Sequence, residues 1–365
     1  MDFSELKSII EINSWTKNRA GVDKNGEIFA KWLDELRMDL TRYRRDDIGD
    51  HLHFRSTSKK GKKLLLLGHI DTVFPPDTFE HFSEDDEWIY GPGVCDMKGG
   101  NYVALQALRN IFRSKGDICN IDLLLVSDEE TGSDDSKYLS AKLAKEYDYC
   151  MVFEAAGPKD EVVTARKGVG TFFVDIEGKA AHAGNHYADG ADANLEAAHK
   201  LSRLVSLTNL DRGTTVNVGK IHGGIGANTI SPTSHLTFEL RYTTTSEKER
   251  VLKAIEKIVS HSYVTGTHAT LGGGIQRDVM QPSDAQLDFV TNINRLCGVS
   301  LPTEHRGGVS DANIISSQGI PTLDGWGPFG DGDHTIYERA SKASFERRIA
   351  LVTEIFEHFM EGEFE

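Results

Sequence analysis

Short, almost wholly apolar runs recur through the first half of the chain. "KKLLLLGH" ends at His69, "NIDLLLV" is followed at once by "SDEE", and "YDYCMVFEAA" carries Glu154 near its end. Runs this short and this apolar are typical of strands buried on both faces of a sheet. Between the first two runs, residues 99–116 place apolar residues near helical spacing. This alternation predicts an α/β fold, a mostly parallel sheet with helices on both faces.

The middle of the chain has a different pattern. Residues 170–180, 214–224, 234–244 and 268–274 predict strands, and residues 192–207 and 246–261 predict helices. Their order, βαββαβ, is that of a small ferredoxin-like α+β domain. Ser246 with Glu249 three residues later predicts a capping box at the start of the second helix. We therefore expect a discontinuous catalytic domain, residues 1–165 and 281–365, interrupted by an inserted domain, residues 166–280.

Composition narrows the choice of partners. The 365 residues carry a formal net charge of -15, which argues against nucleic acid or an anionic membrane as a partner. No apolar run approaches the ~20 residues that a membrane-spanning helix needs. The four cysteines form no CxxC pair, and the first residues lack a signal-peptide pattern. These features predict a cytoplasmic protein with reduced thiols.

Potential ligands and bases follow the apolar runs. In parallel sheets, ligands bind beyond the carboxyl ends of the strands. His69 and Asp71 are two residues apart and face one side of an extended chain, as a metal ligand and its orienting carboxylate would; a satisfied polar pair is the alternative. Asp96 lies in a Gly-Pro-Gly turn before a helix, where its two oxygens suit a bridging ligand and equally a helix cap.

The adjacent glutamates Glu129 and Glu130 read on their own as a solvated acidic turn. This interpretation changes when Glu130 is considered together with four other side chains that offer oxygen or nitrogen atoms to a metal. The full set is His69, Asp96, Glu130, Glu154 and His334. Two three-ligand sites that share one carboxylate account for all five. A metal pair about 3.5–4 Å apart would generate a hydroxide nucleophile and stabilise a tetrahedral intermediate. Glu129 then remains as the general base that this chemistry requires.

Several motifs occur in the order typical of one family: "GHIDTVFP", "YGPGVCDMKGG", "VSDEETGS", "VFEAA", "GKAAHAG", "GANTISP", "LRYT", "GGVSDA" and "GDGDH". From about His69 to the C-terminus, the chain resembles the zinc-dependent aminoacylase, acetylornithine deacetylase and glutamate carboxypeptidase family. The resemblance implies two Zn²⁺ ions per chain, with Co²⁺ or Mn²⁺ as alternatives. One ion would be held by His69, Asp96 and Glu154. The other would be held by Asp96, Glu130 and His334.

The resemblance also implies roles for neighbouring residues. Asp71 would orient His69, Glu129 would move a proton from the bridging water to the leaving amine, and the Asp96-Met97 peptide bond would be cis. The inserted domain would act as a lid and as the contact of a homodimer, in which His182 stabilises the oxyanion in the partner's site. A loop-capping histidine is the alternative for His182.

Substrate binding is implied at four further positions. Asn228 and Arg241 resemble the residues that hold substrate, with Arg241 pairing with a free carboxylate; an ordinary strand-edge arginine is the alternative. The turn around Gly308 and Ser310 would offer backbone amides at a helix start.

The predicted function is a di-zinc metallohydrolase that cleaves an amide bond and releases an amino acid with a free carboxylate. Its substrate would be a small peptide or an N-acyl-amino acid. Glutamate at position 154, where aminopeptidase members tend to have aspartate, favours the carboxypeptidase and aminoacylase types. An aminopeptidase or dipeptidase of the same family and a catalytically silent binding homologue are the alternatives.

Overall fold

The computed structural model describes residues 1–364, which form two compact units. The first unit contains residues 1–165, 282–306 and 310–364, and the second contains residues 166–281 and 307–309. Each unit has its own hydrophobic core. Arg166 and Met280, near the two ends of the second unit, form an antiparallel bridge through two backbone hydrogen bonds of 3.0 and 3.1 Å.

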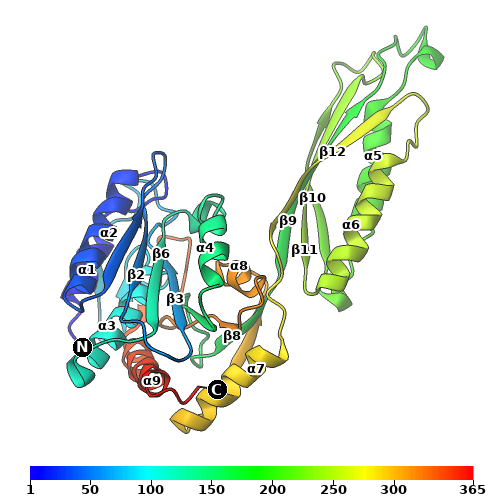
Figure 1. Cartoon of the computed structure of the whole chain (residues 1–365). Helices are drawn as coiled ribbons and strands as arrows, with labels where there is room; N and C mark the ends of the chain where they lie inside the picture. The colour runs from blue at the N-terminus through cyan, green and yellow to red at the C-terminus, as the bar shows by residue number, and fades with distance from the viewer. Residues whose placement is uncertain (365) are drawn as a thin grey trace. The chain divides into compact units, whose positions relative to one another are not determined.

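A mixed sheet forms the centre of the first unit (Figure 1). Its strands are, in spatial order, β1 (Asp39–Tyr43), β2 (His51–Arg55), β6 (Ile121–Val126), β3 (Leu64–His69), β7 (Tyr149–Val152) and β14 (Thr322–Leu323). The four strands from β6 to β14 run parallel, whereas β1 and β2 are antiparallel additions at one edge. The prediction of an α/β fold with a mostly parallel sheet is confirmed.

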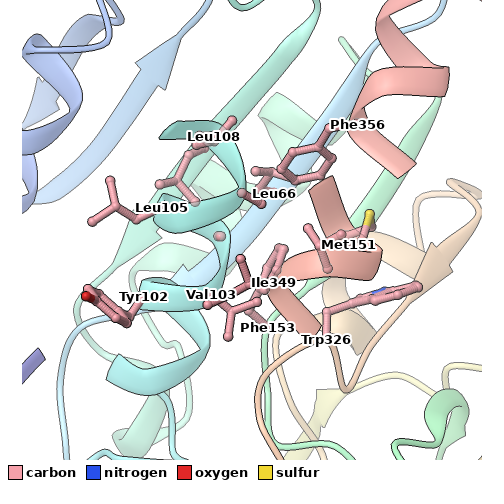
Figure 2. Packing of buried hydrophobic residues seen from close by; sticks show 14 of the residues in the cluster. Leu66, Tyr102, Val103, Leu105, Leu108, Met151, Phe153, Trp326, Ile349 and Phe356 are labelled. Carbon is pink, nitrogen blue, oxygen red and sulfur yellow. The ribbon is translucent and has the colours of Figure 1, made fainter. Parts of the chain in front are cut away.

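Helices surround this sheet. They are α1 (Ser4–Ile10), α2 (Arg19–Asp34), α3 (Lys98–Lys115), α4 (Ser136–Ala144), α7 (Asp284–Cys297), α8 (Ala312–Ser316) and α9 (Lys342–Met360). Every residue of β3 is buried, which requires cover on both faces because successive side chains point to opposite sides. Figure 2 shows Leu108 of α3 and Phe356 of α9 beside Leu66 of β3. Gly100 permits the close approach of α3, since a Cβ there would lie 1.8 Å from the Phe153 carbonyl oxygen.

Two small sheets complete the first unit. One pairs β8 (Val162–Arg166) with β13 (Thr303–Arg306). The other contains, in spatial order, β15 (Gly330–Asp331), β16 (Arg339–Ser341), β5 (Trp88–Tyr90) and β4 (Ser83–Glu84). The pairing of β16 with β5 brings the segment after His334 next to the turn that carries Asp96.

The second unit is an antiparallel sheet with two helices. Along the chain its elements are β9 (Gly168–Glu177), α5 (Ala193–Val205), β10 (Thr215–Gly223), β11 (Thr233–Tyr242), α6 (Thr245–Ser260) and β12 (His268–Arg277). The spatial order β10-β11-β9-β12 is that of a ferredoxin-like fold, as the sequence predicts. Alternating residues such as Val174, Leu236 and Phe238 face α5 and α6 in its core.

The predicted cap of α6 is wrong by two residues. Thr244, not Ser246, is the N-cap: its backbone is extended and its hydroxyl accepts a hydrogen bond from the Glu247 N–H. The Glu247 carboxylate binds Arg250, Arg212 and Thr214. Both positions match the Ser/Thr-x-x-Glu pattern, so the pattern alone did not distinguish them.

Within residues 1–364, no helix is both long and apolar enough to cross a lipid bilayer.

Candidate active site

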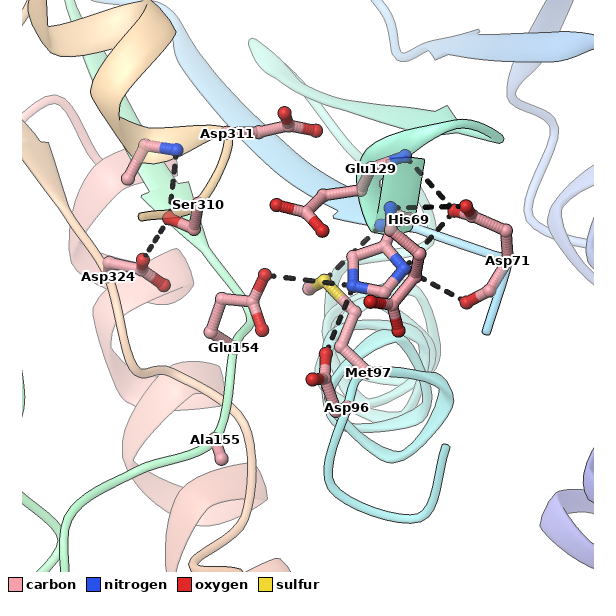
Figure 3. A network of polar contacts seen from close by, with 12 residues as sticks. His69, Asp71, Asp96, Met97, Glu129, Glu154, Ala155, Ser310, Asp311 and Asp324 are labelled. Atoms are coloured by element: carbon pink, nitrogen blue, oxygen red, sulfur yellow. Dashed lines mark hydrogen bonds and ion pairs between the residues drawn. The ribbon is translucent and has the colours of Figure 1, made fainter. Parts of the chain in front are cut away.

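The predicted ligands of the first unit gather at the carboxyl ends of its parallel strands (Figure 3). His69 is the last residue of β3, and Glu154 follows β7. Glu129 and Glu130 open a short 3₁₀ helix, η1 (Glu129–Thr131), just after β6. Because β6, β3 and β7 are neighbours, their ends bring these side chains to one edge of the sheet.

Two groups of possible ligand atoms share Asp96. In the first, His69 Nε2 lies 3.1 Å from Asp96 Oδ1 and 3.7 Å from Glu154 Oε1. In the second, His334 Nε2 lies 3.2 Å from Asp96 Oδ2 and 3.1 Å from Glu130 Oε2. Within each group the possible ligand atoms lie within 4.8 Å of one another. The two oxygens of Asp96 therefore face different groups.

Ionisation in this cluster is strongly perturbed. Burial raises the pKa of Glu130 to about 8, and the nearby negative charge of Asp96 adds to the effect. Burial and the Asp96 charge likewise raise the pKa of Glu154 well above its usual value. Burial also disfavours the charge on Asp96, but hydrogen bonds from His334 and His69 outweigh it and lower its pKa. Hydrogen bonds to Asp96 and Glu130 raise the pKa of His334 to about 11.

These residues fit divalent cations. Two imidazoles and three carboxylates converge, and burial together with the charge of Asp96 raises the pKa of Glu130 and Glu154. Bound cations would offset the repulsion between these carboxylates. The ligand atoms are nitrogen and oxygen, with no thiolate, which suits Zn²⁺, Co²⁺ or Mn²⁺.

Asp71 connects both sides of the cluster. Its side chain is fully buried, and His69 Nδ1 lies 3.0 Å from the Asp71 backbone carbonyl and 3.4 Å from Oδ1 of the Asp71 carboxylate. The same carboxylate accepts the backbone N–H groups of Glu129 at 3.3 Å and Glu130 at 3.2 Å. Thr16 donates its hydroxyl to Asp71 Oδ2 at 2.6 Å. Asp71 thus fixes an imidazole and the backbone of both glutamates at once.

Glu129 lies beside the cluster without belonging to either group. Its side chain is only 9% exposed. Figure 3 shows its carboxyl group on the side of the cluster where Glu154 lies. Its negative charge contributes to the raised pKa values of Glu154 and Glu130.

Several contacts around the ligands were not found from the sequence. The Asn101 side-chain amide donates to the His69 carbonyl at 2.6 Å, and Glu338 accepts the Asp96 backbone N–H at 3.1 Å. The contact of Thr16 with Asp71 could not be predicted from the sequence, because Thr16 lies in a segment without a recognisable motif. Glu338 could have been noticed as a glutamate four residues after His334. The expected cis peptide bond between Asp96 and Met97 is present.

The other predicted site residues of the inserted segment lie in the second unit. His182 is exposed, and its Nδ1 accepts the N–H groups of Gly184 and Asn185 at 3.1 Å each. Asn228 is exposed on a neighbouring loop, where its carbonyl accepts the Ala183 N–H. With Nδ1 accepting, His182 carries its proton on Nε2 when neutral.

The predicted carboxylate-binding groups already have partners within the chain. Arg241 pairs with Glu239 through Nε at 2.7 Å and donates from Nη1 to the Gly307 carbonyl. The Gly308 carbonyl accepts from Arg166. In the first unit, Ser310 is buried; its N–H donates to the Asn313 side chain at 3.0 Å and its hydroxyl donates to Asp324 at 2.7 Å. Substrate binding at Arg241 or Ser310 would require exchange of these bonds.

An α/β sheet whose strand ends gather imidazoles and carboxylates in this way is typical of a metal-dependent hydrolase. The model of Peptidase family M20/M25/M40 matches residues 65–358. The chain belongs to this family.

Proteins similar to this chain include a carboxypeptidase, a desuccinylase and an aminopeptidase. The chain is 27% identical over 341 residues to carboxypeptidase G2 from Pseudomonas sp. (strain RS-16), covering 90% of this chain and 82% of that protein. It is 26% identical over 348 residues to succinyl-diaminopimelate desuccinylase from Helicobacter pylori (strain ATCC 700392 / 26695), covering 86% and 84%. Aminopeptidase PepT from Bacillus cereus ATCC 10987 has the same fold, with a TM-score of 0.79, 22% identity and coverage of 98% and 97%.

Proposed function

We propose that this protein is a di-zinc amide hydrolase that releases an amino acid with a free carboxylate from a small peptide or an N-acyl-amino acid. The observation that carries the proposal is the pair of three-residue groups that share Asp96, with Glu129 beside them. The similarity to carboxypeptidase G2 and to succinyl-diaminopimelate desuccinylase supports this substrate class, because a carboxypeptidase removes a C-terminal amino acid and a desuccinylase removes a succinyl group.

The predicted metal ligands, the base and Asp71, all in the first unit, each have a role in this proposal. His69, Asp96 and Glu154 would hold one Zn²⁺, and Asp96, Glu130 and His334 would hold the other. When bound, such ions polarise the scissile carbonyl and activate a water molecule as the nucleophile. The Glu129 carboxylate accepts the proton of that water and passes it to the leaving nitrogen. The Asp71 backbone carbonyl and carboxylate would keep the proton of His69 on Nδ1, which would leave Nε2 free to act as the metal ligand.

The second unit supplies the remaining parts of the proposal. Its residues 166–280 would act as a lid and as the contact of a homodimer. His182 would donate from Nε2 to the oxyanion in a partner's site, a role supported by the two N–H groups that occupy its Nδ1. Arg241 would exchange Glu239 for a substrate carboxylate, and Asn228 and the turn at Gly308 and Ser310 would complete substrate binding.

Replacing Glu129 by Gln tests the assignment of the base. We expect both metal ions to remain bound and kcat to fall roughly 10²–10⁴-fold, because general-base catalysis contributes about that much. Metal content and steady-state kinetics would be measured on the same preparation. Glu130→Gln is the matched control and should lose metal as well as turnover. Full activity of Glu129→Gln with zinc bound would exclude Glu129 as the base.

A substrate panel tests the reaction class. N-acyl-amino acids and peptides with free C-termini should be cleaved, whereas dipeptides that depend on a free amine should be poor substrates. Exclusive cleavage of free-amine dipeptides would favour an aminopeptidase or dipeptidase instead. Absence of turnover on the whole panel, together with less than one zinc per chain, would favour a silent binding homologue.

A further inference from the structure

Glu338 is a buried carboxylate attached to the turn that carries Asp96. Its side chain is 1% exposed. Its Oε2 accepts the Gly93 N–H at 3.0 Å, and its Oε1 accepts the N–H groups of Cys95 at 3.0 Å and Asp96 at 3.1 Å. One side chain thereby binds three backbone groups of a single turn.

The backbone around Glu338 holds the same turn. The Gly91 N–H donates to the Glu338 carbonyl at 3.3 Å, and β16, which begins at Arg339, pairs with β5, which ends at Tyr90. The turn has an unusual backbone, since Gly91 and Gly93 have φ values of 154° and 81°. Main chain and side chain of one segment thus fix both the entry to this turn and its end at Asp96.

The hydrogen bonds of Glu338 compensate for the free energy that is lost when its carboxylate is buried. Burial of a carboxylate is unfavourable unless strong hydrogen bonds compensate. Backbone N–H groups that donate to an ionised carboxylate form such bonds. Glu338 binds the Asp96 main chain and leaves both Asp96 side-chain oxygens to His69 and His334.

We propose that Glu338 is a positioning residue that fixes the Asp96 backbone so that its two carboxylate oxygens face the two ligand groups. Glu338 also lies four residues after His334 in the same loop, so it connects the shared ligand to a ligand of the second group. This inference rests on the proposed function, because it assigns Glu338 a task only if Asp96 is a shared metal ligand.

Glu338→Gln provides the test. Glutamine has nearly the same shape, but it removes the charge and directs an NH₂ group toward a backbone N–H. Zinc affinity, measured by competition with a chromophoric chelator, should fall roughly 10–100-fold, as is usual when a partner of a metal ligand is lost. The kcat should fall while KM stays unchanged, because Glu338 is buried and binds the backbone of the turn that carries Asp96. The visible spectrum of the Co²⁺-substituted protein should change as well.

Glu196→Gln is the matched control. Glu196 is also 1% exposed and its Oε2 also accepts two backbone N–H groups, those of Tyr263 and Val264, but it lies in the second unit. This variant should lose stability and keep the zinc affinity and Co²⁺ spectrum of the wild type. Glu338→Asp retains the charge but shortens the side chain by one methylene group, so it should bind zinc more tightly than Glu338→Gln and less tightly than the wild type. It provides the readout if Glu338→Gln does not fold.

The outcomes separate this inference from the proposed function. If Glu338→Gln, or Glu338→Asp where only that variant folds, binds zinc with wild-type affinity and spectrum, Glu338 has only a structural role and the inference is wrong. If the wild type binds no zinc and cleaves no amide, the proposed function itself fails.

Discussion

Individual residues at this site differ in how far the sequence could predict them. His69, Glu130 and Glu154 follow apolar runs, and hydrophobicity marks those runs as strands whose ends meet at one edge. Thr16 and Glu338 reach the cluster only through tertiary contacts, and no local pattern encodes such contacts. The sequence therefore predicted the candidate ligands and Asp71, which lies two residues after His69, and it missed supporting residues that are distant in sequence from the ligand they contact.

His53 makes stability depend on pH. It is fully buried, and its Nε2 lies 2.8 Å from the Tyr147 hydroxyl, which itself donates to Asp122. Its Nδ1 has no hydrogen-bond partner among residues 1–364, so protonation there would bury an unpaired charge. Burial, with help from the positive charge of Arg55, lowers its pKa to about 4.

The sign of the effect follows from this lowered pKa. The unfolded chain takes up a proton near pH 6.5, whereas the folded chain stays neutral until about pH 4, so acid favours unfolding within this window. We expect the protonation of His53 in the unfolded chain to lower the free energy of unfolding by ~2 kcal/mol when the pH falls from 7 to 5. Urea unfolding of the wild type and of His53→Gln at both pH values measures it. An equal loss of unfolding free energy in the wild type and in His53→Gln would show that His53 does not cause the pH dependence.

At the scale of elements, hydrophobic patterns identified the buried strands β3, β6 and β7 and the helices α3, α5 and α6, and they did not identify the elements of the N-terminal region. The helices α1 and α2 and the edge strands β1 and β2 lie in the first 55 residues, where no motif or long apolar run stands out. The strands of the small sheets are two to five residues long and are held by partners distant in sequence. A pattern within one short segment cannot report such pairing.

The start of α6 allows a direct test of a cap. Removal of the Thr244 hydroxyl by substitution with Ala should lower the free energy of unfolding by ~1 kcal/mol, since the Glu247 N–H loses its partner. Ser246→Ala removes a hydroxyl two residues further along, which lies 3.0 Å from the Thr244 hydroxyl, and it should change stability by less than about 0.5 kcal/mol. Chemical denaturation of the two variants compares them. The opposite ranking would place the cap at Ser246.

At the scale of the whole molecule, each unit has its own hydrophobic core, and the proposed metal-binding residues all belong to one unit. The sequence pattern changes near residue 166 from continuous apolar runs to alternating apolar and polar residues. The reason is that strands of the parallel sheet are buried on both faces, whereas strands of the antiparallel sheet are buried on one. The cluster lies entirely in the first unit. Metal binding should therefore stabilise one part of the molecule and leave the other unaffected.

Metal removal should separate the unfolding of the two units. With zinc at about 100 times its dissociation constant, binding stabilises the folded form by about 2.7 kcal/mol per site. Calorimetry after chelation should show one transition moved to lower temperature and one unchanged. Asp96→Asn, which lacks the shared carboxylate, should show no response to added zinc. A uniform shift of all transitions in the wild type would mean that the units unfold as one.

The bridge between Arg166 and Met280 has a consequence for how this chain can be rearranged. The polypeptide leaves for the second unit and returns from it as an antiparallel pair of hydrogen-bonded residues. Antiparallel neighbours of this kind can be joined by a two-residue hairpin turn. The whole intervening segment is therefore exchangeable: a gene rearrangement can replace it with a tight turn or with a foreign module while the ends that it must join keep their spacing.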